Sequence, residues 1–250
     1  MIDSYTHCGI DKYEPVESVV EAMEYSEITR AVLVQHLGQF DNSYIDNVVK
    51  DNPETFTGVG LVDTTDTNWY REIEALRNSD SFMGIRFSSP SILGNFDAVI
   101  EAGQMGLNLI LYTPDGIDEV SQEIAALARK VPDTSIVLTH LGCPEQKVDV
   151  DRRNCSIIRL GEFSNIFVGL SGQHMFCEYP YRDLLVYTKR IVETYTSKRI
   201  MWGSNFPVCG SVEAYRSDLS YISSEHLELS DVEVQDITEN TARNLFFPGS

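Results

Sequence analysis

Histidine, arginine and tyrosine side chains recur at or just beyond the ends of short apolar segments in this chain. Imidazole can donate or accept a proton near neutral pH, and a guanidinium can hold a carboxylate through two parallel hydrogen bonds. Such a set could bind a small acid and polarise its carbonyl group, provided that one fold brings the side chains together. The residues are Tyr5, His7, Arg86, Tyr112, His140 and His174, with Asn205 after the last apolar segment.

Eight short apolar segments of strand type alternate with eight amphipathic segments of helical type. The predicted strands are Ile2–His7, Ala31–Gln35, Thr57–Val62, Met83–Phe87, Leu107–Tyr112, Ser135–His140, Ile166–Leu170 and Arg199–Gly203. The predicted helices are Pro15–Tyr25, Ser43–Lys50, Trp69–Arg77, Phe96–Ala102, Ile117–Lys130, Arg152–Phe163, Tyr181–Tyr195 and Val212–Ser223. This alternation, with strands that are apolar throughout, predicts a (β/α)8 TIM barrel. An open doubly wound sheet is the alternative, but no glycine-rich phosphate-binding sequence follows the first strand.

A further helix is predicted at the C-terminus. Ser230 and Glu233 have the spacing of a capping box, and apolar residues at helical spacing follow them. There is no internal repeat, low-complexity tract or linker, so residues 1–250 are predicted to form a single barrel domain.

The predicted barrel explains where the polar residues lie. In TIM barrels the catalytic groups stand at the C-terminal ends of the strands. Tyr5 and His7 are two residues apart and therefore share one side of the first strand. Ser171 and His174 follow the seventh strand in the same way. The convergence of these residues at one rim predicts an active site there.

Composition limits the partners of the protein. The net charge is -19, with 38 acidic and 19 basic residues, which disfavours nucleic acid and anionic membranes. No apolar run approaches the length of a membrane span, and no basic segment precedes the first strand, so a cytoplasmic protein with a small-molecule substrate is expected. Five cysteines without a Cys-x-x-Cys pair favour free thiols.

Several segments resemble the amidohydrolase superfamily, specifically its branch of amidohydrolase-related lactonases and decarboxylases. The matching segments are Ile2-Asp3-Ser4-Tyr5-Thr6-His7, Gly84-Ile85-Arg86, Thr139-His140-Leu141-Gly142-Cys143-Pro144, Leu170-Ser171-Gly172, Met201-Trp202-Gly203-Ser204-Asn205-Phe206-Pro207, and Asn240-Thr241-Ala242-Arg243 with Leu245-Phe246. The resemblance covers essentially the whole chain, and its two most specific parts are Trp-Gly-Ser-x-x-Pro and His-Leu-Gly-x-Pro. It implies a barrel enzyme, and dimers are common among such barrels, so a homodimer is one expectation.

The departures from this family pattern concern the metal site. Metal-bearing members carry His-x-His on the first strand, where this chain has Tyr5, and a histidine on the fifth strand, where it has Tyr112. The aspartate of the eighth strand, a metal ligand or general base in the family, is Asn205. Only His7 and His140 remain of the usual ligands, and a catalytic zinc needs about three. We therefore expect no metal cofactor. The alternative is a zinc-dependent hydrolase or decarboxylase of the same superfamily with a rearranged site.

The resemblance is closest to metal-independent pyrone-dicarboxylate lactonase and sugar-acid lactonases. It implies a hydrolase of a small carboxylated lactone or related cyclic acid, with His7, His140, Tyr112 and Asn205 as catalytic residues. Arg86 matches the family's carboxylate-binding position, and Tyr5, Ser171 and His174 are further candidates for substrate binding.

Other interpretations remain open from the sequence. Each histidine could be a buried core residue that donates to a carbonyl group, and Arg86 could belong to a structural ion pair. Asn205 cannot act as a carboxylate base, so the site could also be a catalytically silent one that only binds a small acid, or Asn205 could stand where the natural protein has Asp. Cys8, Cys143, Cys177 and Cys209, with His174, could form an unusual zinc site, or one of them could be a nucleophile.

Overall fold

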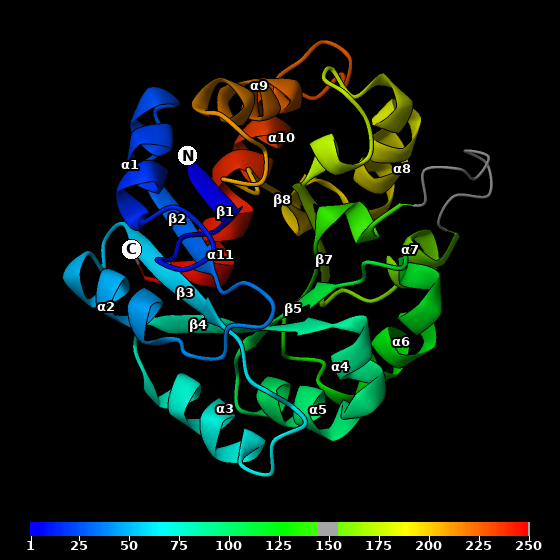
Figure 1. Ribbon diagram of the computed structural model, residues 1–250. Coiled ribbons are helices and arrows are strands. Elements are labelled where there is room, and N and C mark those ends of the chain that lie inside the picture. The colour runs from blue at the N-terminus through cyan, green and yellow to red at the C-terminus, as the bar shows by residue number, and fades with distance from the viewer. Residues whose placement is uncertain (145–154, 250) are drawn as a thin grey trace.

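Eight parallel strands form the centre of the computed structural model, which describes residues 1–144 and 155–249. The strands pair in chain order, each with the next, so that they curve into a nearly closed barrel (Figure 1). They are β1 (Ile2–Thr6), β2 (Arg30–Val34), β3 (Phe56–Gly60), β4 (Phe82–Ser88), β5 (Asn108–Tyr112), β6 (Ile136–Leu138), β7 (Ile166–Ser171) and β8 (Ile200–Gly203). The predicted (β/α)8 barrel is confirmed.

Helices surround the strands and connect each one to the next (Figure 1). They are α1 (Val16–Tyr25), α2 (Ser43–Asp51), α3 (Trp69–Asn78), α4 (Ser89–Gly94), α5 (Phe96–Gln104), α6 (Ser121–Lys130), α7 (Cys155–Leu160), α8 (Leu185–Tyr195), α9 (Val212–Ile222), α10 (Asp231–Gln235) and α11 (Thr241–Phe246). Apolar side chains of this outer layer pack on the outward faces of the strands, which makes the strands apolar on both sides. None of the helices in the described residues is long and apolar enough to cross a lipid bilayer.

Some boundaries differ from the prediction, and local backbone geometry explains them. The sixth strand was predicted to reach His140 but ends at Leu138, because His140 and Leu141 have φ of 52° and 56° and turn the chain out of the sheet. The short helix α4, which starts at a serine and a proline, was not predicted. Of the helix predicted at 152–163, residues 155–160 are helical, and residues 152–154 lie outside the described part of the chain.

The C-terminal segment closes one end of the barrel. The predicted capping box is present at Ser230 and Glu233, and a π-helical turn over Asp236–Asn240 joins α10 to α11. Ala242 and Phe246 of α11 pack against Ile2 and Val32 inside the barrel, at the N-terminal ends of the strands. With this end filled by apolar side chains, a polar site has room only at the opposite, C-terminal ends.

Side chains of β1 join it to β8, where the barrel closes. The Asp3 carboxylate accepts hydrogen bonds from the Ser204 amide (2.9 Å) and the Ser204 hydroxyl (2.6 Å). The Asn205 amide then donates to the Tyr5 carbonyl, and the His7 amide donates to the Phe206 carbonyl, both at 2.8 Å. A Cβ on Gly203 would lie 2.6 Å from the Cβ of Tyr5, so the two strands can approach this closely only with glycine there. The seam therefore fixes the two strand ends that carry His7 and Asn205.

A second buried carboxyl group lies on the outer side of this seam. Asp218 of α9 is fully buried and accepts a hydrogen bond from the indole Nε1 of Trp202 at 3.1 Å. Burial raises the pKa of Asp218 to about 7, and hydrogen bonds from Tyr181 and Trp202 offset only part of this effect. In the unfolded chain the Asp218 carboxyl group ionises near its usual pKa of 3.8. Its contribution to the stability of the fold is therefore most favourable below that pH, and this contribution is lost as the pH rises to about 7.

We therefore expect Asp218→Asn to stabilise the protein at pH 8 by on the order of 3 kcal/mol. The amide oxygen can still accept from the Trp202 indole, while the buried charge is gone. The gain should become small near pH 4, where Asp218 is protonated in the folded wild-type chain and only partly ionised in the unfolded one. Urea unfolding at pH 4, 6 and 8 measures it. Asp218→Ala is the control: it removes the same charge but loses the indole bond, so it should be less stable than Asp218→Asn at every pH. A gain of the Asn variant that does not depend on pH would contradict the prediction.

Candidate active site

A cavity of about 180 Å³ opens at the C-terminal ends of the strands. Five of the residues predicted from the sequence line it, contributed by β4, β5 and the segments directly after β1, β6 and β8. The lining consists of His7, Lys12, Tyr13, Leu37, Arg86, Tyr112, His140, Met175, Asn205 and Val208. Tyr5, Ser171 and His174 are not in this lining, but each contacts a residue that is. The structure thus brings the predicted set together at one rim.

His7 stands with one ring nitrogen fixed. Its Nδ1 lies 2.6 Å from the Val34 carbonyl oxygen, so Nδ1 carries the proton and donates it. Burial, with the nearby Arg86 guanidinium, holds the pKa of His7 well below its usual value of 6.5. The ring is therefore neutral at physiological pH, and its Nε2 carries a lone pair that can accept a hydrogen bond or a proton.

His140 has its Nδ1 beside a hydroxyl group, where His7 has a carbonyl oxygen. The Ser171 hydroxyl oxygen accepts a hydrogen bond from the His140 backbone amide (3.2 Å) and lies 3.0 Å from Nδ1. A hydroxyl group can donate as well as accept, so this contact is compatible with an imidazole proton on Nε2. Burial is the main cause that lowers the pKa of His140 to about 3, so this ring is also neutral. Ser171 thus orients His140, and a Cβ on Gly172 would lie only 2.6 Å from the same Nδ1.

Arg86 enters the cavity between two aromatic rings. Its guanidinium carbon lies 5.7 Å from the ring centre of Tyr5 and 5.1 Å from that of Tyr112. Nη1 donates to the Gln35 carbonyl at 3.0 Å, whereas Nε and the Tyr5 hydroxyl are buried with no hydrogen-bond partner in the described residues. Within the same residues no carboxylate forms an ion pair with Arg86, so the structural ion pair considered from the sequence is not found there. A buried guanidinium with a free donor is suited to an anionic ligand.

Asn205 occupies the left-handed region of backbone space, with φ of 56°, which asparagine tolerates better than most residues. Its side-chain nitrogen lies 3.4 Å from Nε2 of His174 and 3.5 Å from the Met175 sulfur. The amide is thus directed towards the loop after β7, and His174 contacts the cavity through it.

Sequence reasoning missed Lys12 and Tyr13, which follow β1 in a loop without a recognisable motif. Tyr13 stacks on the His7 ring, with ring centres 5.0 Å apart and planes 14° from parallel. Lys12 adds a second cationic side chain to the lining, which contains Arg86 and no carboxylate. In a protein of net charge -19 this is a marked local reversal of sign. The position of both residues directly after the strand that delivers His7 was the available signal.

Three of the candidate thiols do not have the properties of nucleophiles. Burial raises the pKa of Cys8 and of Cys143 to about 12 each, and it also raises that of Cys209. A thiol with such a pKa stays protonated at neutral pH and reacts poorly. At these three positions the alternative nucleophile read from the sequence is not supported.

The residues do not fit the family's metal site. Among residues 1–144 and 155–249, no three or more His, Cys, Asp or Glu side chains are grouped so that they could hold a metal ion. At the positions where metal-bearing relatives have ligands, Tyr5, Tyr112 and Asn205 supply phenols and an amide, which are poor partners for zinc.

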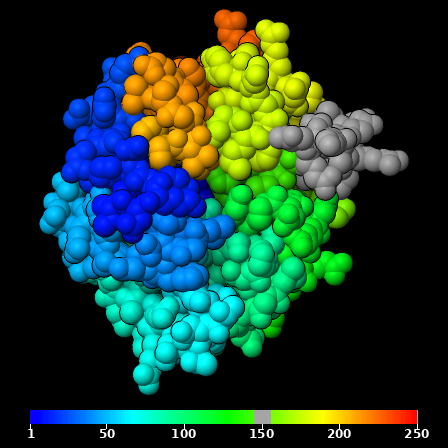
Figure 2. All heavy atoms as spheres, viewed as in Figure 1, coloured from blue at the N-terminus to red at the C-terminus, as the bar shows by residue number. Residues whose placement is uncertain are grey.

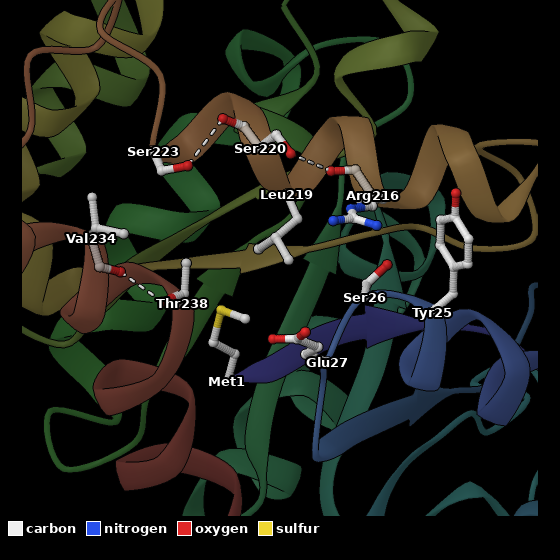
Figure 3. A pocket seen from close by; sticks show the side chains of 10 residues that line it. All are labelled: Met1, Tyr25, Ser26, Glu27, Arg216, Leu219, Ser220, Ser223, Val234 and Thr238. Carbon is white, nitrogen blue, oxygen red and sulfur yellow. Dashed lines mark hydrogen bonds between the residues drawn. The ribbon is translucent and has the colours of Figure 1, made fainter.

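A second depression, of about 230 Å³, lies near the other end of the barrel between α1, α9 and the C-terminal helices (Figure 3). Most of its hydroxyl groups donate hydrogen bonds to backbone carbonyl groups three or four residues earlier in the chain. Ser220, Ser223 and Thr238 donate to backbone carbonyl groups at 2.8, 3.3 and 2.8 Å. No histidine lines it, whereas His7 and His140 line the cavity at the strand ends.

Comparison with solved structures finds the same fold in enzymes of several kinds. A candidate 2-pyrone-4,6-dicarboxylic acid hydrolase from Pseudomonas putida superposes with a TM-score of 0.80 at 20% identity, covering 98% of this chain and 97% of that one. An amidohydrolase from Burkholderia multivorans with bound zinc gives 0.78 at 17% identity, with 98% of each chain covered. The 5-carboxyvanillate decarboxylase from Sphingomonas paucimobilis gives 0.69 at 14% identity, with coverage of 99% and 98%. At these identities the likeness establishes the fold alone.

Comparison by sequence gives the family. A search of curated protein sequences finds no significant match. The amidohydrolase family model, however, matches residues 7–247, which span both the strand-end residues and the closing helix. This match agrees with the resemblance read from the sequence segments. The chain belongs to the amidohydrolase family.

Proposed function

We propose that this protein hydrolyses a small lactone that carries a carboxylate, and that it does so without a metal ion. The observation that carries the proposal is a pair of neutral imidazoles facing one cavity beside a buried guanidinium, with Nδ1 of His7 at a carbonyl oxygen and Nδ1 of His140 at a hydroxyl group. In the proposal, His7 offers a lone pair at Nε2, and His140, whose Nδ1 accepts from Ser171, offers an N–H group. The lone pair can remove a proton from water, and the N–H group can stabilise the negative charge that develops on a carbonyl oxygen.

The cationic groups support an anionic substrate of limited size. Arg86 lies at the base of the cavity with Nε free, and Lys12 stands at its rim. The cavity volume of about 180 Å³ is below the roughly 300–1,000 Å³ of pockets for drug-sized ligands. A single ring with one or two substituents is therefore the size of ligand that we expect.

In the proposed reaction, Arg86 holds the substrate carboxylate. The Nε2–H of His140 donates to the lactone carbonyl oxygen, and a water molecule attacks the carbonyl carbon while its proton passes to Nε2 of His7. The bond from that carbon to the ring oxygen then breaks, and the His7 imidazolium returns the proton to the released oxygen. The product is an open-chain hydroxy acid. Asn205, at the same rim, can orient the water through its amide.

The test is turnover of a panel of lactones with and without a carboxylate, followed by proton release in weakly buffered solution and repeated with a chelator. We expect hydrolysis of carboxylated members only, at a rate that the chelator leaves unchanged. Activity that appears only after zinc is added would overturn the metal-free proposal, and no hydrolysis of any member would overturn the lactonase proposal.

Decarboxylation is the second candidate, because a similar barrel is a decarboxylase and the same guanidinium could hold a carboxylate that is lost. The two reactions differ in their products. Decarboxylation releases carbon dioxide, whereas lactone hydrolysis releases a proton and no gas. Measuring carbon dioxide from aromatic and unsaturated acids alongside the lactone panel separates the two.

A further inference from the structure

A larger cavity, of about 360 Å³, lies beside the catalytic one. It is lined by Lys12, Tyr13, Glu14, Ser18, Glu21, Phe206, Pro207, Gly210, Ser211 and Val212. These residues belong to the segment from Lys12 into α1 and to the segment between β8 and α9. Figure 2 shows dark blue atoms of the N-terminal segment lying against orange atoms of the segment that follows β8. Lys12 and Tyr13 line both cavities, so their side chains form the wall between them.

Ring contacts hold the Tyr13 side chain in this wall. One face stacks on His7, and the ring meets His36 at 89° with ring centres 5.3 Å apart. The Lys12 ammonium group lies 5.4 Å from the ring centre. Tyr13 therefore has two consequences for the catalytic cavity: it covers one face of His7, and it ends the space available in the direction of the second cavity.

The second cavity differs in charge from the first. Two carboxylates, Glu14 and Glu21, line it against a single cation, Lys12, whereas the first cavity has two cations and no carboxylate. The rest of its lining includes the hydroxyl-bearing Ser18 and Ser211 and the apolar Phe206 and Val212. Carboxylates and hydroxyl groups there can accept hydrogen bonds from an uncharged polar group, and they would repel an anion. The two cavities together would thus suit a ligand with an anionic head and an uncharged, hydrogen-bonding tail.

We infer that Tyr13 determines the length of the substrate: its ring confines the ligand to the smaller cavity, and the space beyond accepts an uncharged extension once the ring is removed. The inference rests on the proposed carboxylate site at Arg86. It assigns to the loop after β1 a role in selecting substrates by length, and to Glu14 and Glu21 a role in rejecting a second anionic end.

The experiment measures binding, so that it does not depend on turnover. Omega-hydroxycarboxylates of four, six, eight and ten carbons are titrated by calorimetry into wild type, Tyr13→Ala and Tyr13→Phe. We expect wild type and Tyr13→Phe to bind the shortest acid best. Tyr13→Ala should bind the ten-carbon acid at least about tenfold more tightly than wild type does, which corresponds to roughly 1.4 kcal/mol of binding free energy. Circular dichroism and thermal unfolding establish that each variant is folded.

A ligand with a charged tail tests whether the tail lies in the second cavity or in bulk solvent. The ten-carbon dicarboxylate should gain nothing from Tyr13→Ala, because its far end would meet Glu14 and Glu21; adding Glu21→Gln should restore part of the gain. Equal gains in affinity for the hydroxy acid and the dicarboxylate would mean that the tail lies in solvent. If Tyr13→Ala ranked the acids of different length by affinity as wild type does, Tyr13 would be no barrier. Either result overturns the inference. Failure of every acid to bind wild type would instead contradict the proposed carboxylate site itself, and the inference with it.

Discussion

Replacing Arg86 by methionine is expected to lower kcat/KM for a carboxylated lactone by about 10²–10³-fold, equivalent to roughly 3–4 kcal/mol of lost transition-state binding. The guanidinium is buried between the Tyr5 and Tyr112 rings, and its Nε has no partner in the described residues. In such a site a carboxylate exchanges its water for a charge-assisted hydrogen bond, and methionine offers none. Steady-state kinetics with the best substrate of the lactone panel measures the loss.

Two controls separate substrate binding from folding. An uncharged methyl ester of the same lactone should react with wild type and Arg86→Met at similar rates, because it makes no ion pair in either. Arg86→Lys keeps the charge but offers a single point of contact instead of a fork, so it should recover only part of the rate. If Arg86→Met lowered kcat/KM equally for the acid and the ester, the guanidinium would act through the fold, for example through its 3.0 Å bond to the Gln35 carbonyl.

Arg86 also shows which parts of the structure a sequence can reveal. Apolar strand segments and their alternation with helices are local patterns, and they were sufficient to predict the barrel and to assign His7, Arg86, Tyr112 and Asn205 to its rim. The bond from Arg86 to the Gln35 carbonyl joins residues 51 positions apart and follows from the geometry of the closed barrel. No local pattern encodes such a contact.

The turn at His140 and the loop after β1 were beyond the reach of sequence patterns for different reasons. The sixth segment reads as an apolar strand up to His140, yet the left-handed backbone at His140 and Leu141 ends it early and turns the imidazole towards Ser171. The sequence placed Ser171 with the substrate-binding residues, whereas its contacts orient a histidine. Lys12 and Tyr13 have no periodicity or motif, and only the packing of the loop over His7 brings them to the cavity.

The closing helix was predicted as an element but not in its role. Residues 230–246 have the capping box and apolar spacing of a helix, and the structure has three helical turns of different kind there. Ala242 and Phe246 fill the barrel interior at the N-terminal ends of the strands. Amphipathic spacing alone does not distinguish a helix that covers a barrel from one that plugs it, because both need an apolar face.

Replacing His7 by alanine should lower kcat by about 10³-fold, within the range of roughly 10²–10⁴ for loss of a general base. The Val34 carbonyl leaves Nε2 of His7 free to take the proton of the attacking water, and alanine offers no base at this position. The exposed His226, in the loop between α9 and α10, is a matched control, and His226→Ala should leave kcat unchanged. A His7→Ala variant with wild-type kcat would assign the proton transfer elsewhere.

The pH dependence provides an independent test of the same role. Burial and the Arg86 guanidinium both hold the pKa of His7 well below its usual value of 6.5. A base is active when deprotonated, so kcat/KM of wild type should be level from about pH 6.5 upwards and fall only at lower pH. Arg86→Met removes one cause of the low pKa, and the acid limb of its profile should therefore move to higher pH, even for the uncharged ester that bypasses carboxylate binding. An acid limb that stays in place would mean that His7 does not titrate in the rate-limiting step, and it would exclude His140 as the base as well, because the Arg86 guanidinium also lowers the pKa of His140.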